Sequence, residues 1–307
     1  MRDVLPLTAS LWAGTRTFEQ YGRQTLEFAQ SRYGRRHYRT IGLYDRRVCV
    51  ASFKRYDRTL HHGTRRLPAI GFGAVFTPAQ HRGRGYASLM VAAALDEARA
   101  GGYALAYLFS DIGPQFYAAL GFRALKSRQF SLDAATLLAT KLDLASLGSE
   151  SLPAVRRLFD RCERRREIGF LRNAAVWDLV AMRLRHATEH PAGNATNLVV
   201  RNRGAIAAYV LGARKPISDA YVLEEFGFSG ERGAALLPAL LRAAAGDLRR
   251  ITGWLPPGST RRTLPNATVR KRRSAISMMA PLTAEGRRLI EAIAASGDDF
   301  CWASDHV

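Results

Sequence analysis

Cysteine is scarce in this sequence, since 307 residues contain three of them, Cys49, Cys162 and Cys301. They are far apart and odd in number. They therefore provide neither the paired framework of a disulfide-rich domain nor the close spacing of a zinc site. This pattern excludes a disulfide scaffold, predicts no metal site, and indicates a chain that works in a reducing cytoplasm.

Long apolar runs are also missing. No stretch approaches the roughly 20 apolar residues that a membrane-spanning helix needs, and the segment from Met1 to Pro6 lacks the apolar core of a secretory signal. We therefore expect no membrane association. The hydrophobic content of 47% is ample for packed cores, and the length suits two domains of ordinary size.

Lysine is rare, although the formal net charge is +20. Of 46 basic residues, five are lysine and the rest are arginine, and most of the arginines are dispersed along the chain. Neither a recognition-helix pattern nor a zinc-finger spacing accompanies them, and aromatic residues do not alternate with them as on a base-stacking surface. The composition favours a solvated basic surface over a nucleic-acid interface.

A glycine-containing turn, Gln80 to Gly85, separates an apolar run (Ile70 to Thr77) from an Ala/Leu-rich helical run (Ser88 to Arg99). The order strand, glycine turn, helix exposes main-chain N–H groups at a helix N-terminus, which suits a phosphate. No lysine follows Gly85 as in a P-loop, and Ser88 replaces the third glycine of a dinucleotide fingerprint. The turn therefore predicts an anion site of another kind.

The segment from Val75 to Ala87 resembles the acyl-CoA-binding motif of the GNAT superfamily of acetyltransferases, [RQ]-x-x-G-x-[GA]. The signature positions are filled by Gln80, Gly83 and Gly85. Downstream, Phe116 to Phe122 is similar to the F-Y-x-x-x-G-F segment of the same family. The resemblance covers residues 15–135. It implies an α/β (α+β) fold with acetyl-CoA as cosubstrate, and transfer of the acetyl group to a primary amine in a direct ternary complex.

The resemblance also implies roles for individual residues. The main chain of the strand before the turn would pair with the pantetheine arm, through Val75, Phe76 and Thr77. The pyrophosphate would bind to main-chain amides of the turn and of the first helical residues. These residues are Arg82, Gly83, Arg84, Gly85, Tyr86, Ala87 and Ser88, and the Ser88 hydroxyl would add a further contact. The two arginine side chains either add contacts to the phosphates or point to solvent.

Tyr117 matches the tyrosine that protonates the departing thiolate in this family. A phenol can supply that proton near neutral pH. The alternative is a purely structural aromatic residue at the start of a helix. Asp111, after the preceding strand, is expected to cap this helix rather than act as a base.

The general base is not evident, because the strand from Ile70 to Val75 contains no carboxylate. The candidates are His61 and His62, in a segment expected to be a polar loop (Asp57 to Leu67), together with Glu19 and a chain of waters. Resemblance to the enhanced intracellular survival acetyltransferases adds the terminal carboxylate of Val307. We favour a packing role for the last residues, with Phe300 and Trp302 between two domains.

The second half repeats the order of the first. Its strand–turn–helix–strand unit comprises Tyr221 to Phe228, Ser229 to Gly233, a helix to Leu248 and Ile251 to Leu255. The turn lacks the signature glycine spacing, and Glu231 would repel a phosphate. We therefore predict two GNAT-like mixed-sheet domains in tandem, a cofactor-binding one over residues 1–140 and a degenerate one over 141–307. This arrangement resembles enhanced intracellular survival acetyltransferases and mycothiol synthase.

The second half is expected to shape the acceptor site. Glu224 and Glu225 are adjacent on a predicted strand, so one side chain faces the cleft and the other faces away. A carboxylate there would favour a cationic amine, either a small molecule or a peptide. The alternative function is a non-catalytic acyl-CoA-binding sensor.

Overall fold

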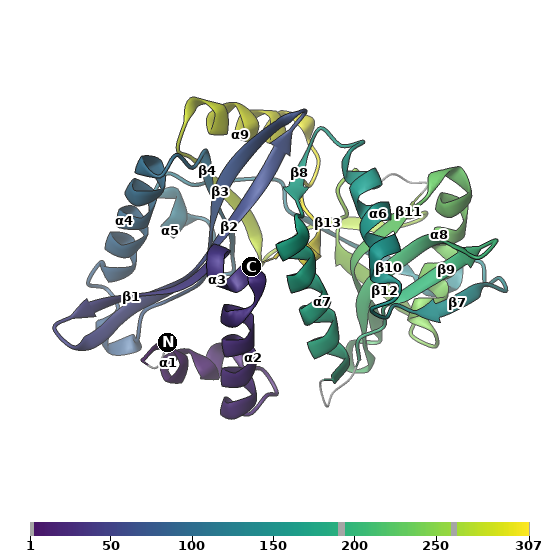
Figure 1. Ribbon diagram of the computed structural model, residues 1–307, viewed down its shortest axis with the longest axis horizontal. Helices are drawn as coiled ribbons and strands as arrows, with labels where there is room; N and C mark the ends of the chain where they lie inside the picture. The colour runs from purple at the N-terminus through teal and green to yellow at the C-terminus, as the bar shows by residue number, and fades with distance from the viewer. Residues whose placement is uncertain (1–2, 190–193, 259–262, 307) are drawn as a thin grey trace.

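Two mixed β-sheets lie side by side in the computed structural model, which describes residues 3–189, 194–258 and 263–306 (Figure 1). The first sheet has the order β1-β2-β3-β4-β14-β5, with β8 paired to β2, and the second has the order β13-β6-β12-β11-β10-β9-β7. Helices cover both sheets. The predicted α/β fold with two mixed sheets is confirmed.

The first sheet is built mainly from the first half of the chain. Its strands are β1 (Tyr38–Asp45), β2 (Val48–His62), β3 (Arg65–Phe76), β4 (Leu105–Ser110), β5 (Arg123–Ala124), β8 (Ile168–Leu171) and β14 (Ile276–Pro281). The helices around it are α1 (Val4–Trp12), α2 (Phe18–Gln30), α3 (Arg32–His37), α4 (Tyr86–Ala100), α5 (Gln115–Ala118) and α9 (Ala284–Ser296).

The second sheet repeats this plan. Its strands are β6 (Arg128–Asp133), β7 (Asp143–Ser146), β9 (Leu198–Asn202), β10 (Ala205–Lys215), β11 (Ala220–Phe228), β12 (Arg250–Trp254) and β13 (Thr268–Lys271). The helices that pack with it are α6 (Leu152–Glu163), α7 (Ala174–Glu189) and α8 (Gly230–Ala245). Four 3₁₀ turns are described: η1 (Ala79–His81), η2 (Ala134–Thr136), η3 (Pro216–Ser218) and η4 (Ala303–Asp305).

Local sequence explains where several helices begin. Thr17 and Gln20 form a capping box at α2, in which the Gln20 amide donates to Thr17 Oγ1 at 3.2 Å and the Thr17 amide donates to Gln20 Oε1 at 2.9 Å. Thr283 caps α9 by accepting from the Gly286 amide at 3.2 Å. Such caps satisfy amides that the helix itself leaves unpaired.

The two sheets exchange strands. β14, from the second half, lies between β4 and β5 in the first sheet, with Met278 opposite Leu108. β6, from the first half, lies beside β12 in the second sheet, with Phe130 opposite Gly253. The predicted division between residues 140 and 141 therefore does not coincide with the division between the sheets. An apolar strand pattern specifies a buried strand but not the sheet that receives it.

The segment from Asp57 to Leu67, predicted as a polar loop, instead continues the β2–β3 hairpin around a turn at Gly63. Leu60 is 0% exposed, because β8 pairs with this end of β2 and second-half residues pack over it. The prediction was wrong because the burial comes from a strand about 110 residues further along the chain.

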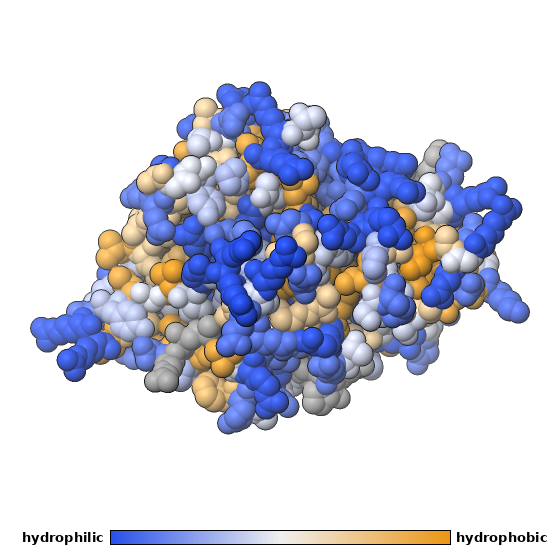
Figure 2. Space-filling view, viewed as in Figure 1, coloured by the Kyte–Doolittle hydropathy of each residue, from blue (hydrophilic) through white to orange (hydrophobic). Residues whose placement is uncertain are grey.

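Hydrophilic residues cover most of the face seen in Figure 2, with smaller apolar patches between them. Among the helices of the described residues, none is both long and apolar enough to cross a bilayer.

Candidate functional site

The first sheet opens between β3 and β4. Their parallel pairing runs from Ala69 opposite Leu105 to Phe72 opposite Leu108, while β3 itself continues to Phe76. Beyond Phe72, the main chain of β3 thus has no β4 partner within the described residues. This leaves an edge to which an extended chain can hydrogen-bond.

A bulge shapes the open end of β3. The pairing with β2 shifts between Ser52, opposite Phe76, and Lys54, opposite Gly73. Ala74, inside the bulge, has a φ of +48°. This left-handed conformation costs a residue with a side chain about 1–2 kcal/mol, and bulges often lie next to active sites. No local pattern in the sequence predicts this bulge.

The glycine turn presents a set of free amides. Gly83 and Gly85 have φ values of +75° and +77°, and a Cβ at either position would meet no atom within 4 Å. Gly85 is the N-cap of α4. In the described chain the main-chain N–H groups from Gly83 to Ser88 donate no hydrogen bond. Together they form the kind of cradle that binds a phosphate.

Arg82 differs from the rest of this cradle. Its amide donates to the Ala79 carbonyl at 3.2 Å, and its Nε donates to the Thr77 carbonyl at 3.1 Å. The residue therefore stabilises the turn, and its amide, which we expected to bind phosphate, already has a partner. The hydroxyl of Thr77 is buried without a hydrogen-bond partner at the start of the same turn.

Tyr117 lies beneath the open edge. Its side chain is 7% exposed, packs against Phe122 with ring centroids 5.9 Å apart, and lines the cleft described next. Burial, with a smaller contribution from the Asp111 carboxylate, raises the pKa of Tyr117 to about 12. The phenol is therefore protonated at neutral pH.

A cleft of about 920 Å³ runs from the open edge of the first sheet to the second. The first half contributes β3, the end of β4 and Tyr117, and the second half contributes α7, β10, β11 and β12. Aromatic side chains form much of its wall: Trp12, Tyr21, Phe28, Tyr38, Tyr56, Phe72, Phe109 and Trp254. The cleft is large enough for the reactive end of a cofactor and a second substrate.

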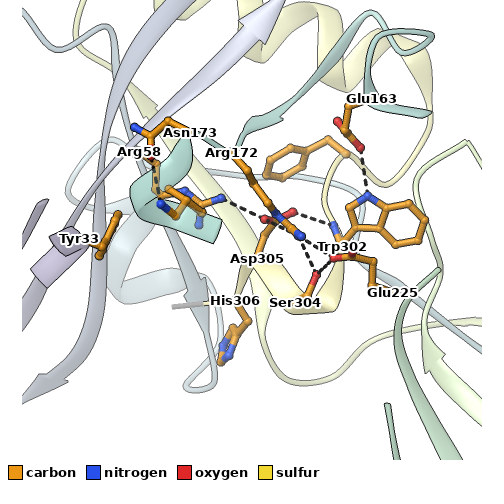
Figure 3. Close-up of polar contacts among 12 residues, drawn as sticks. Tyr33, Arg58, Glu163, Arg172, Asn173, Glu225, Trp302, Ser304, Asp305 and His306 are labelled. Atoms are coloured by element: carbon orange, nitrogen blue, oxygen red, sulfur yellow. Dashed lines mark hydrogen bonds and ion pairs between the residues drawn. The ribbon is translucent and has the colours of Figure 1, made fainter. Parts of the chain in front are cut away.

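The side chains of the two adjacent glutamates point to opposite faces of β11, as predicted. Glu224 lines the cleft and has no ion-pair partner among the described residues, and desolvation by the cleft walls raises its pKa. Glu225 is 0% exposed, accepts a hydrogen bond from Tyr209 at 2.7 Å and pairs with Arg172 at 2.6 Å. One carboxylate therefore faces the cleft while its neighbour belongs to a buried network (Figure 3).

The last described residues pack between the two sheets. Phe300 and Trp302 are each 5% exposed and belong to different cores. Asp305 is buried and contacts the guanidinium groups of Arg58 at 3.0 Å and Arg172 at 3.1 Å (Figure 3). The predicted packing role is confirmed, whereas Val307 lies outside the described residues. His306 lines the cleft, which the sequence reasoning missed.

The predicted bases and the predicted cap lie elsewhere. His61 is buried beside Glu163, 3.7 Å away, and neither it nor His62 nor Glu19 lines the cleft. Asp111 does not cap α5. It lines the cleft and accepts a hydrogen bond from the Ala275 amide at 2.8 Å, because the loop before β14 lies beside the end of β4.

The equivalent edge of the second sheet is filled. The pairing of β11 with β12 ends at Leu223 opposite Gly253, as in the first sheet. Trp302 packs there on Phe226, with ring centroids 5.1 Å apart, and Ser304 donates to Glu225. The protein's own C-terminal segment thus lies along β11 where the first sheet is open. In the described parts of the chain, no cluster of residues suits a metal ion.

Comparison with known proteins gives one family match, the Acetyltransferase (GNAT) domain over residues 3–125. No curated protein sequence matches significantly. Among solved structures, a GCN5-related N-acetyltransferase from Kribbella flavida is similar with a TM-score of 0.67 and 20% identity, covering 93% of this chain and 70% of that one.

Two further structures bear on the predicted tandem arrangement. Eis1 from Mycobacterium abscessus matches with a TM-score of 0.57 and 14% identity over 88% of this chain and 72% of that one. A tandem GNAT protein from the clavulanic acid biosynthesis pathway matches with a TM-score of 0.53 and 13% identity, covering 92% of this chain and 94% of that one.

Proposed function

Residues 3–125 form a GNAT acetyltransferase domain within a chain of tandem GNAT fold, and from this premise we propose that the protein transfers the acetyl group of acetyl-CoA to a primary amine in one ternary complex. A single observation carries the proposal. The open edge of β3 and the protonated Tyr117 line one cleft, and the free amides of the glycine turn follow directly after β3 along the chain.

Acetyl-CoA fits the described residues. The amides from Gly83 to Ser88 would hold the pyrophosphate, and the positive φ of both glycines keeps side chains out of the way. The main chain of Val75, Phe76 and Thr77 would pair with the pantetheine arm, and the unpartnered Thr77 hydroxyl is available for a further hydrogen bond. The thioester would then lie in the gap between β3 and β4.

Tyr117 would act as the general acid. When the amine attacks the thioester carbonyl, the C–S bond breaks and the sulfur leaves as a thiolate, which takes the phenolic proton. A raised pKa keeps this proton on Tyr117 at neutral pH until the stronger base, the thiolate, develops in an environment that also disfavours charge.

The acceptor would enter from the side of the second sheet. Aromatic walls suit an apolar body, and Glu224, without an ion-pair partner in the described chain, would attract a positive charge at the far wall. We therefore expect amines with an apolar body and a second cationic group to be better acceptors than small neutral ones.

The test is thiol release from acetyl-CoA by the full chain with a panel of amines, namely tyramine, putrescine, kanamycin and a lysine-containing peptide. We expect release that depends on both protein and amine, with acetylated amine formed in equal amount. Acetyl-CoA binding without release for every amine would favour the alternative, a non-catalytic acyl-CoA sensor.

A further inference from the structure

The proposed reaction needs a group that removes a proton from the attacking amine, and the cleft contains a residue suited to it. We propose that His306 is the general base of the acyl transfer, accepting the amine proton on the opposite face of the first sheet from Tyr117. The inference rests on the proposed function and adds a catalytic residue to it.

His306 lies at the junction of the two halves. Its ring packs on Phe109, at the end of β4, with centroids 5.1 Å apart, and on Trp254, at the end of β12, with centroids 5.5 Å apart. Its ring nitrogens form no hydrogen bond to any described residue, and the side chain is exposed to the cleft. Figure 3 shows the ring turned away from the buried network around Asp305.

Alternation along β4 places His306 and Tyr117 on opposite faces. Leu108 packs in the same core as Tyr117 and α4, while the next residue, Phe109, points to the other face, where His306 covers it. A thioester in the gap between β3 and β4 would lie between the two side chains. The thiolate would leave toward Tyr117, and the amine would approach from the side of His306.

The C-terminal segment fixes this ring in position. Asp305, the preceding residue, is held by Arg58 and Arg172, at 3.0 and 3.1 Å. From α7, Arg183 donates to the carbonyls of Ser304 and His306 at 3.5 and 3.3 Å. A base held by its neighbours keeps its orientation while substrates enter and leave.

The surroundings of His306 keep it neutral. Desolvation by the cleft walls lowers the pKa of His306 to about 4, with Asp111 opposing this shift and Arg183 and Arg272 contributing to it. A neutral imidazole accepts a proton through a ring nitrogen. The proton is transferred from the N⁺–H of the tetrahedral intermediate, which is more acidic than the free ammonium. Tyr117 gives its own proton to the thiolate, and the proton taken by His306 passes to water, from which Tyr117 regains one.

The experiment compares His306→Gln with His62→Gln, a matched substitution at a histidine outside the cleft. Each full-length variant is measured for acetyl-CoA affinity by calorimetry and for thiol release with the amine of the panel that the wild type uses fastest. Loss of a general base should lower kcat by about 10²-fold or more with little change in acetyl-CoA affinity. His62→Gln should retain the wild-type rate.

A second variant separates catalysis from structure. His306→Gly removes the imidazole, and added imidazole should restore part of its rate while leaving the rates of the wild type and of Tyr117→Phe unchanged. A rate for His306→Gln within about threefold of wild type, or a slow His306→Gly that imidazole does not rescue, would overturn this role while leaving the proposed function standing. A wild type that binds acetyl-CoA but acetylates no amine would overturn both.

Discussion

Asp305→Asn tests whether the C-terminal segment holds the two halves together. The substitution keeps the size of the side chain and removes its negative charge. In the wild type this carboxylate contacts Arg58 and Arg172, and all three side chains are nearly inaccessible, at 2%, 4% and 1% exposed. After substitution, Arg172 would keep the carboxylate of Glu225, whereas Arg58 would have no carboxylate partner among the described residues.

The expected loss of stability follows from the burial of these three side chains. Removing one partner of a buried ion pair typically costs about 3–5 kcal/mol, since the remaining charge is left without compensation. Asparagine still offers one oxygen to the arginines, so we expect the lower end, about 3 kcal/mol. The free energy of unfolding of an ordinary folded protein is about 5–15 kcal/mol, so the variant should still fold.

Urea unfolding followed by circular dichroism measures this loss. With a slope of about 3 kcal/mol per molar urea, the midpoint should fall by about 1 M. The matched control is Asp298→Asn in the same segment. That carboxylate is 64% exposed and lies 3.9 Å from Arg128, so its loss should cost less than about 0.5 kcal/mol. Equal midpoints for both variants would refute the view that Asp305 anchors the segment.

Two further predictions follow from the same geometry. Tyr117→Phe should leave acetyl-CoA affinity unchanged and lower the rate of thiol release by about 10²-fold or more, whereas an unchanged rate in a folded variant would make Tyr117 a structural aromatic residue. Because the pKa of His306 is about 4 in the folded chain and about 6.5 when unfolded, the unfolded state binds more protons between these values, so stability should fall as pH drops through this window. Denaturation midpoints between pH 7 and 4 should fall less steeply for His306→Gln, and parallel curves would contradict the lowered pKa of His306.

The sequence predicted those parts of the site that local patterns encode. The glycine turn and the α4 N-terminus lie where Gln80 to Gly85 placed them, because a strand, two glycines and a helix leave few alternatives. The alternation of Glu224 and Glu225 was likewise predictable, since neighbouring strand residues point to opposite faces. Both cases depend on backbone geometry over a few residues.

The parts that were missed depend on contacts between distant segments. β6 and β14 were recognisable at most as strands, and their exchange between sheets depends on pairing energies that no local pattern shows. His61 appeared to be a loop residue because its cover, β8, comes from the second half. His306 reaches the cleft through an ion pair formed by its neighbour, Asp305, with arginines far away in sequence.

The structure also affects how the C-terminal segment can be tested. Deleting residues 299–307 would remove Phe300, Cys301 and Trp302 from two cores, and the protein would lose stability as well as part of its cleft wall. Large-to-small changes at buried aromatic residues cost about 3–5 kcal/mol each. Point substitutions at Asp305 and His306 therefore separate anchoring from chemistry better than truncation does.

The central claim, that one acetyl-CoA binds at the glycine turn of the first half, is tested most directly by calorimetric titration of the full chain. We predict a stoichiometry of about one, because Trp302 and Ser304 occupy the corresponding edge of the second sheet. Gly83→Asp should abolish binding, since it adds a carboxylate to the anion cradle and strains a residue at a φ of +75°. A stoichiometry near two, or undiminished binding by Gly83→Asp, would contradict this account.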